Sequence, residues 1–332
     1  MAAIFDPKYL QELVNISLIS TIVKLYGIFS EVINLATYQS KGLADLWVTE
    51  IKELEKLNFD TEIYLRLCDL IAVINTSEIL VDKFTSRKRL VSKTKTLQFI
   101  SHYYFAHSYH LILSIYHLCK LNFGSASLIL VRSLVEACID FSYLWLCKKI
   151  SGTDDERTAW GAYGFIRRKS IDSKWEEMQN HRDSLNLPKV KPDHLFEQIQ
   201  SQKLLQEVDN FKNRYHRNHW AKISALDKRA RAVDDTLILS QAIGVDLEQV
   251  YTMVYKWTSE LVHSESAGSD SYIHKHKEGF IIDFGPSGLN VNMAIPMAIQ
   301  VFIATLHIFN HINRLEIDLI EEAKASGCKI FT

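Results

Sequence analysis

Glycine, proline and long uncharged hydrophobic runs are all scarce in this chain of 332 residues. Only 12 glycines and five prolines are present, so few residues break helices or form tight turns. The apolar stretch 13–35 is interrupted by Lys24 and Glu31, and the uncharged stretch 294–309 is shorter than the ~20 residues that a bilayer requires. The first residues also lack a basic segment followed by an apolar core. We therefore expect neither a membrane span nor a secretory signal.

Paired cysteines and an excess of one charge are also missing. The five cysteines stand far apart without a CxxC pair, which argues against zinc ribbons and disulfide frameworks and favours a reduced, cytoplasmic protein. The sequence predicts no metal site and no cofactor. Because 38 basic residues balance 39 acidic ones, nucleic acid would have to bind at a local patch rather than through a general positive field.

Apolar residues recur at three- and four-residue spacing along most of the chain, which predicts an all-α, multi-helix bundle. A short β-hairpin is expected near residues 272–284, where β-branched and aromatic residues surround Glu278-Gly279. The basic stretch 85–96 divides an N-terminal helical region, 1–95, from a main helical domain, 96–332; this stretch also fits a solvated helix face. The apolar N-terminal helices favour oligomerisation or partner binding. The predicted helices span about 8–38, 40–57, 60–82, 96–121, 125–149, 154–182, 193–212, 221–243, 247–263 and 292–325.

The segment 125–149 is apolar on nearly every side, yet it carries Arg132, Glu136 and Asp140 at four-residue steps. These three fall on one stripe of a helix that we expect to be buried. Buried charges must be paired, so the stripe either lines a cleft that binds a carboxylate or phosphate, or forms an internal polar network that fixes helix register.

Tyr255, Ser259 and His263 follow one another at four-residue steps on a second helix. A hydroxyl and an imidazole one turn apart can share a proton, as in general acid–base or nucleophilic catalysis. The alternative is that His263 caps the C-terminal end of the helix, where an imidazolium meets the helix dipole favourably.

A third cluster, residues 211–222, contains Arg214, Arg217, His219 and Trp220. Cations beside aromatic rings can hold phosphates while a base stacks, although a solvated basic surface has the same composition. Arg214 and His219 have R-x4-H spacing, which resembles the catalytic signature of the helical HEPN ribonucleases. In that resemblance, the histidine acts on the ribose hydroxyl and the arginine stabilises phosphate charge. Elsewhere, His307 and His311 could together bind a metal, but their stripe is more simply a solvent face.

An ordered set of residues connects these clusters. It consists of L-x-R-S-L-x-E at residues 130–136, His219-Trp220, and Y-x3-S-x3-V-H at residues 255–263. The set resembles the bacterial domain-of-unknown-function five-six-seven-seven family over about residues 97–315. The resemblance implies a helical, cytosolic bacterial protein with a role in phage defence or a toxin system, and supplies no established reaction. We expect Arg132, Glu136, His219, Ser259 and His263 to converge on one polar cleft; Asp140 has no matching motif position.

Two functions fit these patterns, beside a third option in which the polar network is purely structural and the function lies on an oligomer surface. The first is a metal-independent, HEPN-like ribonuclease effector, with His219, His263, Arg214 and Ser259 as catalytic residues and RNA as the partner. The second is a non-enzymatic sensor or scaffold that binds an anion, a nucleotide or a protein through Arg132 and Glu136. Tyr255, Trp220 and Arg217 are the further ligand-binding candidates. In both cases we expect a homo-oligomer.

Overall fold

The computed structural model describes the helical core of the chain and several short segments outside it. Its residues fall into two compact units, 1–40 with 161–218, and 41–160 with 219–332. Only a few positions of the first unit are described, so the fold below is that of the second. The described residues are 49–57, 59–86, 96–161, 163, 177–180, 182, 184, 213–214, 219–262, 273–276, 279–282 and 290–330.

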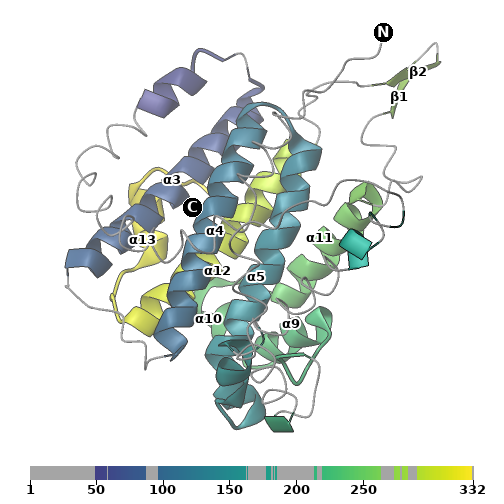
Figure 1. Cartoon of the computed structure of the whole chain (residues 1–332). Helices are drawn as coiled ribbons and strands as arrows, with labels where there is room; N and C mark the ends of the chain where they lie inside the picture. The colour runs from purple at the N-terminus through teal and green to yellow at the C-terminus, as the bar shows by residue number, and fades with distance from the viewer. Residues whose placement is uncertain are drawn as a thin grey trace. The chain divides into compact units, whose positions relative to one another are not determined.

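Four long helices pack together in the second unit (Figure 1). They are α3 (Thr61–Ser86), α4 (Thr96–Lys120), α5 (Gly124–Ser151) and α12 (Val291–Asn313). The short turn 121–123 makes α4 and α5 antiparallel neighbours. Asn290 donates to Ser125 at 3.2 Å where α12 and α5 begin, and Trp145 meets His311 where they end, so these two helices run parallel.

Helix α5 is covered on both sides, which explains why its sequence is apolar all round. Helices α4 and α12 pack on one side, and α9 (Leu226–Asp234) and α11 (Leu247–Val262) pack on the other. Leu128, Leu134, Ile139 and Phe141 are completely buried. Burial of each such side chain stabilises the fold by roughly 1.5–3 kcal/mol, an upper bound relative to a fully extended chain.

Helix α12 is the most apolar element of the bundle, with Phe302 and Phe309 buried at its centre. By length and composition, it is the one described helix that could cross a membrane, but 72% of its most apolar window is buried inside the bundle. A core helix has the same properties, so the expected absence of a membrane span stays a prediction.

Two of the predicted helices are each broken into two. Residues 221–243 form α9 and α10 (Ile238–Ile243), separated at Leu237, whose φ of 59° is left-handed. Residues 292–325 form α12 and α13 (Leu319–Ala325), separated at Arg314, whose φ is 52°. Helix α13 begins at Asp318, whose carboxylate accepts the backbone N–H of Glu321 at 3.2 Å. Neither break contains the glycine or proline that would reveal it in the sequence.

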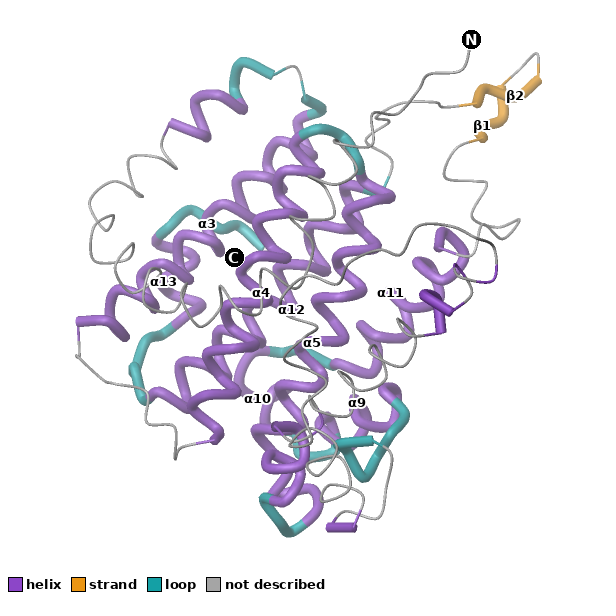
Figure 2. The backbone as a smooth tube through the Cα atoms, in the orientation of Figure 1, coloured by secondary structure: helices purple, strands orange, loops and turns teal. Residues whose placement is uncertain are grey.

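The predicted all-α fold is confirmed, and so is the predicted hairpin. Strands β1 (Ile273–His276) and β2 (Gly279–Ile282) pair antiparallel with His276 opposite Gly279, and they are the only strands among the described residues (Figure 2). The predicted helices 8–38 and 193–212 lie outside the described residues, as does about half of each of 40–57 and 154–182. Residues 87–95, next to the predicted domain boundary, also lie outside them, and the second unit includes α3.

Candidate functional site

Arg132 of α5 faces Tyr255 of α11 in the strongest of the predicted residue groupings. The guanidinium carbon lies 4.2 Å from the centre of the Tyr255 ring, well within cation–π range. Nε of Arg132 also donates to Oε1 of Glu136, one turn further along α5, at 3.0 Å. Tyr251 packs on Tyr255 with ring centres 5.0 Å apart. Arg132, Glu136 and Tyr255, which we predicted from the sequence as ligand-binding residues, therefore lie together.

The charges of this site are less buried than we expected. The side chain of Arg132 is 22% exposed and that of Glu136 is 41% exposed, because α11 covers the stripe only in part. Among the described residues, Arg132 makes a hydrogen bond through Nε alone, so the four N–H groups on Nη1 and Nη2 have no partner there. The guanidinium is thus fixed on one edge and available on the other.

Asp140 forms the second part of the stripe, and its partner is Arg229 of α9. Both Nε and Nη2 of Arg229 lie 2.9 Å from Oδ1 of Asp140. Nη1 of Arg229 donates to the carbonyl oxygens of Ile223 and Ser224 at 2.9 and 2.7 Å. The Arg229 side chain is only 5% exposed. The pair therefore fastens both α9 and the segment before it to α5.

Burial raises the pKa of Asp140 from 3.8 to about 6, and the repulsion from Glu136 adds to this rise. The charge and hydrogen bonds of Arg229 oppose it. A carboxyl with such a pKa exchanges its proton near neutral pH, which is a property shared by catalytic acids and by structural ion pairs.

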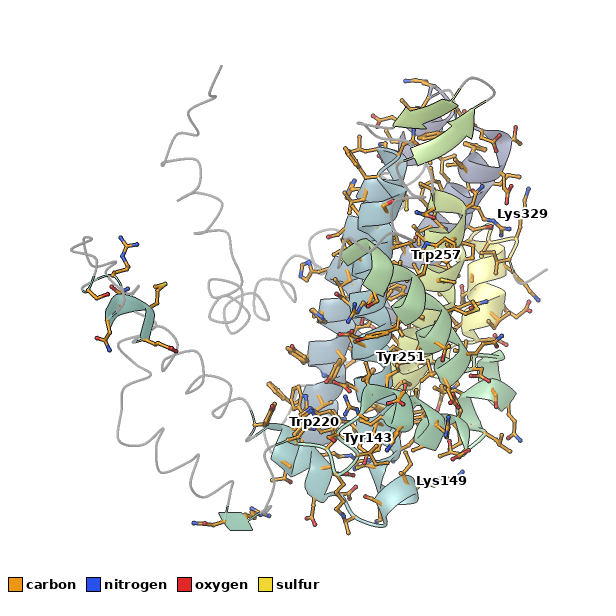
Figure 3. All side chains as sticks on the ribbon, turned by 90° about the vertical axis from the view of Figure 1, so that its right-hand side faces the viewer. Tyr143, Lys149, Trp220, Tyr251, Trp257 and Lys329 are labelled. Atoms are coloured by element: carbon orange, nitrogen blue, oxygen red, sulfur yellow. The ribbon has the colours of Figure 1, made fainter. Side chains whose placement is uncertain are left out.

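Trp220 and His219 lie beside this ion pair. The guanidinium of Arg229 is 5.3 Å from the Trp220 ring, and the buried Trp220 packs edge-on against Tyr143 at 6.0 Å. Figure 3 shows Trp220 and Tyr143 close together near one end of α5. His219 stacks on Trp220, and its Nδ1 accepts the backbone N–H of Ala221 at 3.1 Å. In the neutral ring the proton is therefore on Nε2, which makes that nitrogen a donor rather than a base.

Glu156, which is fully buried, organises the same end of α5. Its carboxylate accepts the hydroxyl of Tyr143 at 2.5 Å and that of Ser151 at 3.0 Å. The backbone N–H of Lys222 completes the set at 3.1 Å. Since every one of these donors belongs to the fold itself, we interpret Glu156 as a structural anchor for the segment that carries Trp220.

Comparison with known protein families gives one match, to a family of unknown function, DUF5677, over residues 98–281. The match covers more than half of the chain. This chain belongs to the DUF5677 family. Neither the curated proteins nor the solved structures contain a match to it. The DUF5677 match includes α4, α5, α9 and α11, and thus the whole Arg132–Asp140 stripe with its partners, whereas α3 and α12 lie outside it.

The remaining predicted site residues of this DUF5677 chain are placed only in part. Ser259 is half-buried on α11, one turn beyond Tyr255. Arg214 is exposed and belongs to the other compact unit, so its position relative to His219 is not defined. His263 and Arg217 lie outside the described residues. The predicted convergence of Arg132, Glu136, His219, Ser259 and His263 stays a prediction.

Sequence reasoning missed Arg229 and Glu156, and it ranked Asp140 too low. Arg229 is one of three basic residues within four positions of α9, and only the crossing of α9 over α5 selects it as the partner of Asp140. The strong amphipathic character of α9 was a usable signal, since the buried side of such a helix carries Arg229 together with Ala230 and Val233. No group of three or more potential metal ligands occurs within the described part of the chain.

Proposed function

We propose that this protein is a helical binding protein that recognises an anionic group at the α5–α11 face. The observation that carries the proposal is the Arg132 guanidinium, whose Nε is bonded to Glu136 and which lies over the Tyr255 ring, while Nη1 and Nη2 have no hydrogen-bond partner among the described residues. The resemblance to HEPN ribonucleases contributes nothing to this choice.

A fixed guanidinium is a better anion receptor than a mobile one. Arg132 carries four N–H groups on Nη1 and Nη2, and their fork geometry matches the two oxygens of a carboxylate or phosphate. The ion pair and the aromatic ring restrict the side chain before any ligand arrives, so less conformational entropy is lost on binding. The partial exposure of Arg132 leaves the site accessible while reducing competition from water.

The ligand class follows from the surroundings of Arg132. Tyr251 and Tyr255 form an aromatic pair beside the guanidinium, which favours a planar group next to the anion. A nucleotide or an RNA phosphate with its base has both features, and an acidic protein segment has only the charge. We therefore place nucleotides and single-stranded RNA first, and a protein partner second.

The test is thermal stabilisation of the full chain by a short single-stranded RNA, at low salt. We expect the stabilisation to disappear in Arg132→Gln, because the loss of charge-assisted hydrogen bonds weakens binding roughly tenfold or more. Arg66→Gln is the control, since Arg66 also pairs with a glutamate four residues away on its own helix, Glu62 on α3, at 4.0 Å. Stabilisation that survives Arg132→Gln, or that Arg66→Gln removes equally, would contradict the proposal.

A metal-independent ribonuclease is the second candidate, and Asp140 favours it. This carboxyl has a pKa of about 6, and it lies against Arg229, which in turn lies over Trp220. A proton donor near neutral pH beside an arginine suits the cleavage of a phosphodiester. The tautomer of His219 opposes its use as a base, so His263 is the better candidate for that role in this mechanism.

The two candidates predict opposite mutational patterns. Ribonuclease activity would give RNA fragments that His263→Ala or Asp140→Asn abolishes, and toxicity on expression that the same variants relieve. The binding function predicts intact RNA, with binding lost in Arg132→Gln and retained in His263→Ala. The wider proposals of cytoplasmic localisation, homo-oligomerisation and a role in phage defence need separate tests by fractionation, by mass measurement in solution, and by plaque counts with and without the gene.

A further inference from the structure

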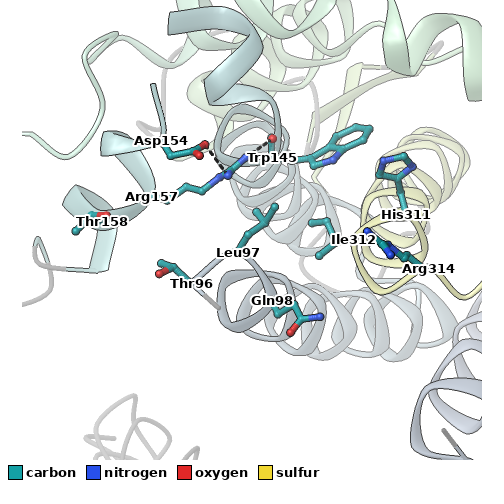
Figure 4. A pocket seen from close by; sticks show the side chains of 10 residues that line it. All are labelled: Thr96, Leu97, Gln98, Trp145, Asp154, Arg157, Thr158, His311, Ile312 and Arg314. Carbon is teal, nitrogen blue, oxygen red and sulfur yellow. Dashed lines mark hydrogen bonds and ion pairs between the residues drawn. The ribbon is translucent and has the colours of Figure 1, made fainter. Parts of the chain in front are cut away.

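A polar pocket lies where α4 begins and where α5 and α12 end. Its volume is about 910 Å³, within the range of small-molecule sites. Figure 4 shows Leu97 and Ile312 in the middle of the pocket, with Arg157 on one side and His311 and Arg314 on the other. The described residues of the lining are Thr96, Leu97, Gln98, Trp145, Asp154, Arg157, Thr158, His311, Ile312 and Arg314.

The pocket contains more hydrogen-bond donors than the protein uses. Arg157 donates to Asp154 and to the carbonyl oxygens of Leu144 and Trp145, at 2.6, 2.8 and 2.7 Å. These bonds occupy three of its five N–H groups, so two have no partner among the described residues. The Trp145 indole N–H and the hydroxyls of Thr96 and Thr158 likewise make no hydrogen bond within the described part of the chain.

The described residues of the lining carry a net positive charge. Arg157 and Arg314 contribute two permanent cations. Asp154 is the only acidic residue among the described lining residues, and its carboxylate is already bonded to Arg157. The carbonyl bonds fix the Arg157 guanidinium at the pocket wall, so it is positioned for an anion before a ligand binds.

An aromatic and apolar surface lies between the cations. The half-buried Trp145 packs edge-on against His311, with ring centres 5.2 Å apart, and Leu97 and Ile312 extend the apolar surface. A planar ring can lie on this surface while a phosphate attached to it reaches an arginine.

We propose that this pocket binds a mononucleotide, with its phosphate at the arginines and its base against Trp145, Leu97 and Ile312. The site is separate from the α5–α11 face, and the proposal does not depend on the function assigned to Arg132. The recognition needs both halves of the ligand, because the cations alone would hold inorganic phosphate and the apolar surface alone would hold a nucleoside.

The probe is adenosine 5′-monophosphate, titrated calorimetrically into the full chain, with adenosine and inorganic phosphate as separate ligands. We expect the nucleotide to bind with a Kd below ~1 mM and each half to bind at least about tenfold more weakly. Lack of nucleotide binding at several millimolar would overturn the proposal. Phosphate that binds as tightly as the nucleotide would overturn it too, because the base would then contribute nothing.

Substitutions of pocket residues test whether the nucleotide binds in this pocket. Arg314→Gln and His311→Gln alter exposed side chains, so the fold should survive, and we expect each to weaken nucleotide binding, Arg314→Gln by about tenfold. The matched controls are Arg66→Gln on α3 and His110→Gln on the exposed face of α4, which should leave the affinity unchanged. Binding that both pocket variants retain would overturn the proposal.

Arg132→Gln separates this proposal from the proposed function. If the pocket is correct, Arg132→Gln retains the nucleotide binding that Arg314→Gln weakens. If Arg132→Gln abolishes the binding and the pocket variants do not, the ligand is at the α5–α11 face and the pocket proposal is wrong. Loss of RNA binding in Arg132→Gln, by contrast, has no bearing on the pocket.

Discussion

Replacement of Arg229 by methionine is the sharpest test of the ion pair that joins α9 to α5. Methionine keeps much of the side-chain volume but removes the hydrogen bond and the ion-pair contact to Asp140, and both bonds to the carbonyl oxygens of Ile223 and Ser224. The Asp140 side chain is 23% exposed, so its carboxylate would be left largely buried without a counter-charge. Breaking a buried pair in this way typically costs about 3–5 kcal/mol.

The loss of unfolding free energy caused by Arg229→Met should depend on pH. The pKa of Asp140 decides whether this loss grows or shrinks as the pH rises. In the native protein this pKa is raised from 3.8 to about 6, so the stability associated with Asp140 is fully present below 3.8 and is lost as the pH rises to about 6. Arg229 lowers this pKa, so its removal raises the value further. Between about 6 and the new pKa, the variant binds a proton that the native protein has released. The cost of the substitution therefore grows by about 1.4 kcal/mol per pH unit across that window and is constant outside it.

Urea unfolding at pH 5 and pH 8, followed by circular dichroism, measures both effects. We expect Arg229→Met to lower the unfolding midpoint strongly at pH 8 and less at pH 5. Arg231→Met is the matched control two residues away, because Arg231 pairs with Glu248 on the exposed side of α9. The reasoning would be refuted if the two variants were equally stable at pH 8, or if the cost of Arg229→Met did not change between the two pH values.

Three further predictions concern the stability of α5, each measured by the same urea assay. Tyr143→Phe removes a hydroxyl donor from the buried Glu156 and should cost about 1–3 kcal/mol, whereas an unchanged midpoint would show that Glu156 does not need this bond. Leu134→Ala creates a cavity at a fully buried position and should cost about 2–5 kcal/mol, whereas a loss below about 1 kcal/mol would contradict the observed packing. Gly152→Ala introduces a side chain where α5 ends with φ of 78° and should cost about 1–2 kcal/mol through backbone strain alone, because no atom lies within 4 Å of the new Cβ; a stabilised variant would refute this.

The main helices could be predicted from the sequence because their apolar spacing is local information. The prediction for α5, 125–149, agrees with the observed Gly124–Ser151 to within two residues at each end. The breaks at Leu237 and Arg314 could not be predicted, since both residues adopt a left-handed conformation without being glycine. Asn310 stabilises the second break, where its amide donates to the Ile317 carbonyl at 2.7 Å. Such a contact exists only once the chain has turned.

The candidate site shows the same division between local and tertiary information. Arg132 and Tyr255 were assigned to one ligand-binding group from the sequence, and the structure brings them within 4.2 Å. The Asp140–Arg229 pair escaped detection because its two residues are 89 positions apart and Asp140 has no place in the family motif. Periodicity assigns a residue to a face of its helix, but the crossing of a second helix decides which residue meets that face.

The polar stripe of α5 has two ends, Arg132 and Asp140, which differ in whether their hydrogen-bonding partners are supplied by the described residues. At Asp140, the carboxylate is bonded to Arg229, and Arg229 is in turn bonded to two carbonyl oxygens, so this end is committed to holding α9 in place. At Arg132, one nitrogen is bonded to Glu136 and the terminal N–H groups have no partner in the described part of the chain. A side chain that served only to fasten α11 would gain from using those donors within the fold, because unmatched donors contribute nothing to stability. Under the function we propose, anion binding belongs to the Arg132 end of the stripe and the structural role to the Asp140 end, so a substitution at either end should affect one of the two without the other.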